Sequence, residues 1–173
     1  MSEQSARSRA EELHAKLGTA KPGIDLDAIL VHLKLRLIQS DLGDEVASML
    51  IRTPTHGNVV CMNSTMPKPR KLIAIAHQVG HFYLQHRFKP GEYVHIDKMD
   101  TVFSRHKGVL EREGKQEAEA QQFATALLMP QSPVLDQVNK HMPLNELSVT
   151  KIAEAFGVSE TAMTLRLKQL RFL

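Results

Sequence analysis

The first third of the chain shows apolar positions at helical spacing. Residues 5–17 form an amphipathic stretch that ends at Gly18, which predicts a first helix. Asp25 stands before a second apolar stripe, so we expect it to cap a short second helix. The stripe consists of Leu26, Ile29, Leu30 and Leu33.

The pattern then changes to short β-type segments. Residues 35–38 are a strand candidate, and residues 47–52 and 58–62 flank Thr-Pro-Thr-His-Gly, a sequence typical of a hairpin loop. The last two segments therefore predict a β-hairpin with a longer loop.

Two longer helical segments follow. Residues 70–86 are apolar on most sides, which predicts a central, buried helix. Residues 88–115 form a long connection, which is usually functional or carries its own short strand. Residues 111–128 are helical again and end before Pro130.

The tail has a different character. Residues 150–156, Gly157 and residues 159–170 follow a helix-turn-helix pattern, with a glycine and a serine cap at the turn. We expect an α+β protein with a mostly helical domain over residues 1–130, and a helical, helix-turn-helix-like region over residues 131–173.

Composition says little about the functional class of the protein. The chain has 173 residues, with 22 Lys and Arg against 19 Asp and Glu, and the positive charges are spread along it. Its single cysteine, Cys61, excludes an intramolecular disulfide. The first ten residues are polar, and no apolar run is long enough to cross a bilayer. We expect a soluble, cytoplasmic protein with no membrane partner.

Two histidines on the predicted central helix have metal-ligand spacing. His77 and His81 stand four apart, so both imidazoles project from one face and can reach one Zn²⁺ at ~2.0–2.1 Å. Gly80 between them allows another element to approach closely. The alternative is a pair of core histidines without metal.

A third ligand is available on the helix over residues 111–128. Its buried face favours Glu117 over Glu119 as that ligand. Gln121, one turn after Glu117, is a candidate to hydrogen-bond a ligand histidine. The alternative is that both glutamates are solvated. The buried face consists of Ala120, Phe123, Ala124, Leu127 and Leu128.

Taken together, these motifs resemble the ImmA/IrrE-type metallopeptidases. The resemblance rests on Ala-His-Gln-Val-Gly-His at 76–81 and on Glu-x-Glu-Ala-x-x-Phe-Ala-x-x-Leu-Leu-Met-Pro at 117–130. Val-Cys-Met-Asn at 60–63, Phe-Ser-Arg at 103–105 and the tail add to it. It implies a small gluzincin-like domain with a small antiparallel sheet and one zinc ion, held by His77, His81 and Glu117. It also implies cleavage of a helix-turn-helix repressor in a stress, phage or mobile-element response.

Gln78 departs from that family pattern. Its position is where the family has the glutamate that acts as general base. Glutamine keeps the shape of glutamate, but its amide cannot take up a proton, so a rate contribution of ~10²–10⁴-fold should vanish. The chain is therefore either an inactivated form of an active endopeptidase or a natural pseudo-peptidase, a zinc-containing antirepressor that acts by binding alone.

Smaller signals remain open. The Cys61 thiolate is a candidate to block the open zinc position, although a packed, inert thiol is the alternative. Tyr93, in the long connection, is a candidate to stabilise an oxyanion. His86 follows His81 by five residues, which does not fit the third metzincin histidine. The remaining histidines are expected at the surface or in turns: His56, His95, His106 and His141.

A DNA-binding regulator is the competing class of function. The second helix of the tail, residues 159–170, would then enter the major groove with Thr161, Thr164 and Arg166. This face carries little positive charge. We therefore expect the tail to dock substrate or support the fold, without specific binding to duplex DNA.

Overall fold

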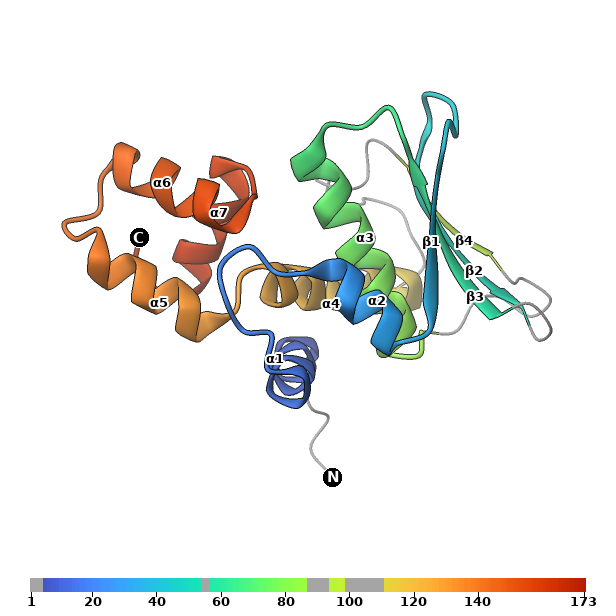
Figure 1. The fold of residues 1–173 in the computed structure, drawn as a ribbon, viewed down its shortest axis with the longest axis horizontal. Coiled ribbons are helices and arrows are strands. Elements are labelled where there is room, and N and C mark those ends of the chain that lie inside the picture. The colour runs from blue at the N-terminus through green and yellow to red at the C-terminus, as the bar shows by residue number, and fades with distance from the viewer. Residues whose placement is uncertain (1–4, 54–56, 87–93, 99–110) are drawn as a thin grey trace.

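The protein is an α+β structure, as predicted from its sequence. The computed structural model describes residues 5–53, 57–86, 94–98 and 111–173. Within these ranges, the helices lie on one side of a small sheet (Figure 1). The helices are α1 Ala6–Leu17, α2 Leu26–His32, α3 Lys68–Tyr83, α4 Glu111–Leu128, α5 Gln131–Lys140, α6 Glu146–Phe156 and α7 Glu160–Gln169. The strands are β1 Leu35–Ser40, β2 Val46–Thr53, β3 Gly57–Asn63 and β4 Val94–Lys98.

The sequence predicts the end of α1 at Gly18 and the cap of α2 at Asp25, and the structure confirms both. The Ser5 side chain accepts a hydrogen bond from the backbone N–H of Ser8 at the start of α1, and Gly18 ends the helix with a φ of 62°. Asp25 caps α2 by accepting from the N–H of Ala28 at 3.1 Å. The signals were reliable because capping depends on residues close in sequence.

The sheet is mixed, so the expectation of a purely antiparallel sheet is wrong. Strands β2 and β3 form the predicted antiparallel hairpin. Strand β4 also runs antiparallel to β2, its partner in the sheet. Strand β1, however, pairs with β3 and runs parallel to it. The reason is the strand order β1-β3-β2-β4, in which β3 lies between β1 and β2. Because β1 and β2 run in opposite directions, β3 must be parallel to one of them, and it is parallel to β1.

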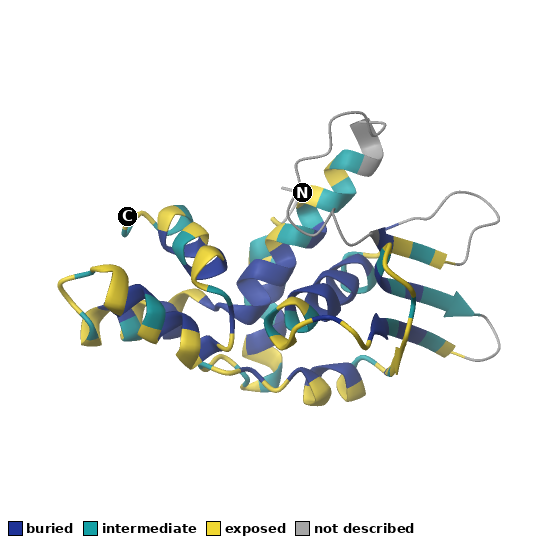
Figure 2. Ribbon diagram, turned by 90° about the horizontal axis from the view of Figure 1, so that it is seen from above, coloured by how far each residue is buried: buried dark blue, intermediate teal, exposed yellow. Residues whose placement is uncertain are grey.

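Helix α3 lies between the sheet and α4, and a long central stretch of it is buried (Figures 1 and 2). Every residue from Ile73 to His81 is buried. The helix ends at Tyr83, three residues earlier than the apolar pattern predicts, because Gln85 adopts a left-handed conformation with a φ of 57°. The long connection carries its own strand, β4, which is one of the two alternatives that its length suggests.

The tail packs onto the same apolar core. Phe156, Met163 and Leu167 belong to one buried cluster together with Leu13 and Phe123. Helix α5 begins at Gln131, directly after the expected division at residue 130. The division at residue 130 stays a prediction. In the described part of the chain, no helix is long and apolar enough to cross a membrane.

Candidate metal centre

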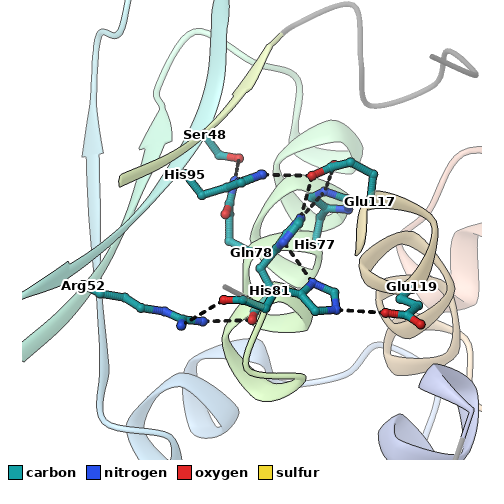
Figure 3. Close-up of polar contacts among 9 residues, drawn as sticks. Ser48, Arg52, His77, Gln78, His81, His95, Glu117 and Glu119 are labelled. Carbon is teal, nitrogen blue, oxygen red and sulfur yellow. Dashed lines mark hydrogen bonds and ion pairs between the residues drawn. The ribbon is translucent and has the colours of Figure 1, made fainter. Parts of the chain in front are cut away.

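Helix α3 brings the two motif histidines together. The Nε2 atoms of His77 and His81 lie 3.0 Å apart, one turn apart on the same face of the helix. Both side chains are buried. Figure 3 shows both histidines beside Glu117.

Helix α4 supplies a carboxylate to the same point. Glu117 Oε2 lies 3.1 Å from His77 Nε2, and its Oε1 lies 3.3 Å from His81 Nε2. Two ligands at ~2.0–2.1 Å from a tetrahedral zinc ion stand about 3.3 Å apart. The three side chains therefore fit a metal ion of this size, and among the described residues they are the group with suitable donors in suitable positions.

The electrostatics of the cluster also suit a cation. Burial lowers the pKa of His81 to about 3, so its imidazole is neutral at pH 7 and keeps a lone pair for a ligand. Burial alone would raise the pKa of Glu117, but hydrogen bonds from His77 and His95 outweigh it and hold this pKa well below its usual range. Glu117 is thus a carboxylate that lies beside the neutral His81 ring.

Gln78 lies next to the cluster on the sheet side of α3. Its side chain is fully buried, and its Nε2 donates to Ser48 Oγ on β2 at 2.9 Å (Figure 3). Its Oε1 is buried and has no hydrogen-bond partner within the described ranges. A buried, unpaired carbonyl oxygen is costly unless water or a ligand satisfies it. This atom therefore marks a place for a hydrogen-bond donor beside the cluster.

His95 belongs to the cluster, although we expected a surface or turn residue. It lies on β4, where its Nε2–H donates to Glu117 Oε1 at 2.9 Å, and its ring lies 3.9 Å from that of His81. Only the pairing of β4 with β2, opposite Leu50, brings it here. The alternation Val94-His95-Ile96-Asp97, which turns His95 and Asp97 to one face, was the available signal.

The other predicted residues have different positions. The Gln121 backbone carbonyl accepts from Thr125, and no side-chain hydrogen bond joins Gln121 to His77 or His81 in the described part. Glu119 contacts His86 instead of a ligand. Cys61 is half-buried on β3 and is not in the group of converging donors. Tyr93, His56, His106 and residues 103–105 lie outside the described residues.

The chain matches one known protein family. A family model for the IrrE N-terminal-like domain, peptidase family M78, matches residues 32–168. The match covers most of the chain and all three residues of the converging group. No curated protein matches the chain.

Proposed function

Because the chain belongs to peptidase family M78, we propose that it carries the zinc centre of a metallo-endopeptidase that recognises a helix-turn-helix repressor. In this form Gln78 makes it inactive. The observation that carries the proposal is the convergence of His77, His81 and Glu117, whose ligand atoms lie 3.0 to 3.3 Å apart, beside the unpaired Gln78 Oε1.

His77, His81 and Glu117 would hold the zinc ion. When bound, zinc supplies Lewis acidity, which polarises the scissile carbonyl and makes an attacking water more acidic. His95 donates to Glu117 Oε1 and thereby fixes the orientation of this carboxylate. The neutral His81 ring needs no deprotonation before it can act as a ligand.

The residue at position 78 determines whether a proton can move. A glutamate there would have two oxygens, one near Ser48 Oγ and one in the place of the unpaired Gln78 Oε1. The second oxygen could take a proton from water and pass it to the leaving amine. The glutamine oxygen can accept a hydrogen bond from water but cannot take its proton. The chain should therefore bind substrate without cutting it.

Binding without cleavage leaves a second function open. A zinc-containing antirepressor would need the recognition surface and the fold but no general base, and Gln78 favours it. A DNA-binding role for the tail is less well supported. Arg166, the one basic residue of the proposed groove-facing set, is 2% exposed and donates to the Met129 carbonyl at 2.9 Å.

The test is to restore the carboxylate. The unchanged protein and Gln78→Glu are each mixed with a helix-turn-helix repressor encoded beside this chain, with and without a chelator, and fragments are followed on gels. We expect one discrete, chelator-sensitive cut by Gln78→Glu and a rate at least ~10²-fold lower for the unchanged protein.

Two control variants isolate the role of position 78. Gln122→Glu adds the same charge at an exposed position of α4 and should not cut. Gln78→Glu with His77→Ala should not cut either, because it loses a ligand. If Gln78→Glu binds zinc and the repressor yet never cleaves it, the antirepressor function replaces the peptidase function for that partner.

A further inference from the structure

The chain after α3 folds back so that His86 returns to His81. Leu84 caps the helix, and Gln85 has a φ of 57°, a left-handed conformation that non-glycine residues rarely adopt. The backbone N–H of His86 then donates to the His81 carbonyl at 3.0 Å. The turn thus places a second histidine beside a predicted metal ligand.

The side chains of His81, His86 and Glu119 form a chain of polar contacts, which we call the relay. His86 Nδ1 lies 3.1 Å from His81 Nδ1, and His86 Nε2 lies 3.2 Å from Glu119 Oε2. His86 is buried, whereas Glu119 is partly exposed on α4. The path from His81 therefore ends at a carboxylate on the same helix that carries Glu117.

Proton positions in this relay follow from the chemistry of its ends. The Glu119 carboxylate only accepts, so a neutral His86 carries its proton on Nε2 and presents a lone pair at Nδ1. His81 must then carry its proton on Nδ1, which leaves the lone pair of Nε2 facing Glu117 Oε1 at 3.3 Å. Two lone pairs at that distance repel each other unless a cation lies between them. The relay therefore prepares His81 for a metal ion.

The backbone of both histidines is also fixed from the sheet. Arg52 on β2 donates through one guanidinium nitrogen to the His81 carbonyl at 2.9 Å and through the other to the His86 carbonyl at 3.1 Å (Figure 3). His77 has no comparable support, because its Nδ1 is buried without a hydrogen-bond partner among the described residues. The relay serves His81 alone.

We propose that His86 and Glu119 are positioning residues, which fix the tautomer and ring orientation of His81 and so raise the affinity of the site for zinc. The inference rests on the proposed zinc centre. Partners of this kind outside the ligand set typically contribute 10–100-fold to metal affinity.

The first measurement is zinc affinity, by competition with a chromophoric chelator. We expect zinc to bind His86→Phe and Glu119→Ala about 10–100-fold more weakly than the unchanged protein. The double variant should bind no more weakly than His86→Phe, because Glu119 acts only through His86. His86→Gln keeps an acceptor and a donor and should restore most of the affinity. His32→Phe, at an exposed histidine of α2, is the control and should change nothing.

The second measurement is the tautomer of His81 in the metal-free protein, from the ¹⁵N shifts of its ring. We expect the proton on Nδ1 in the unchanged protein and a mixture of tautomers in Glu119→Ala, which a purely structural loss would not produce. A proton on Nε2 in the unchanged protein overturns the inference. An unchanged zinc affinity in His86→Phe overturns it while the proposed function stands. A protein that takes up no zinc contradicts both.

Discussion

A Cβ atom on Gly80 would lie 3.0 Å from the Ala120 carbonyl oxygen and 3.1 Å from Ala120 Cα. Helices α3 and α4 therefore touch backbone to backbone at this point. The crossing lies one residue before His81 and three residues after Glu117, so it sets the distance between ligands on the two helices.

Gly80→Ala should consequently damage both the fold and the site. The added methyl group meets backbone, which cannot move aside cheaply, so we expect a loss of about 1–3 kcal/mol in the free energy of unfolding, together with weaker zinc binding. Gly114→Ala on α4 is the matched control. It has open space around it and should stabilise the protein by about 0.5–1 kcal/mol. Urea unfolding of the metal-free proteins measures both, and equal stability of the two variants would contradict this crossing.

His14 should make the fold sensitive to acid. Its ring is buried between α1 and α4, with Nε2 donating to the Leu127 carbonyl at 2.8 Å, and burial lowers its pKa from 6.5. The unfolded chain therefore binds more protons below pH 6.5, so stability falls as the pH drops through that value.

A thermal-unfolding series of the metal-free protein from pH 7.5 to about 5 tests this sign. His14→Gln can keep the donor to Leu127 but does not titrate, so its melting temperature should fall less with pH. Buried His81 contributes in the same direction, so the dependence should shrink without vanishing. If the melting temperatures of both proteins fall equally with pH, His14 is not a source of the acid sensitivity.

What the sequence predicts well is local. The end of α1 at Gly18 and the cap at Asp25 depend on neighbouring residues, and the spacing of His77 and His81 follows from the helix period. The parallel pairing of β1 and the approach of His95 depend instead on strand order, which residues far apart in sequence determine. The contact of His86 depends on a left-handed Gln85, a conformation that glutamine does not signal.

Cys61 should prove irrelevant to the metal. Its neighbours Val60 and Met62 are fully buried on the helix side of β3, so strand alternation turns Cys61 to the other face. Burial also raises the pKa of its thiol, which disfavours the thiolate that zinc requires. Cys61→Ser should leave the zinc affinity unchanged and, in combination with Gln78→Glu, the basal cleavage rate. A large rise in that rate would show that the thiol blocks the site.

Arg166 should contribute to the stability of the fold and not to the binding of nucleic acid. Arg166→Ala leaves the buried Met129 carbonyl without this donor and should lower the free energy of unfolding by about 1–3 kcal/mol. Binding of the unchanged protein to duplex DNA should be weak and fall steeply with salt, as phosphate contacts do. A sequence-selective gel shift that survives physiological salt would support the DNA-binding function instead.

The central claim is that His77, His81 and Glu117 hold one zinc ion, and a crystal of the zinc-loaded protein tests it directly. We expect one strong anomalous peak at the zinc edge, about 2.0–2.2 Å from both Nε2 atoms and from a Glu117 oxygen. His95, Glu119 and Cys61 should stay outside that distance. A peak held by another set of side chains, or no peak in a crystal grown with zinc, would contradict the account.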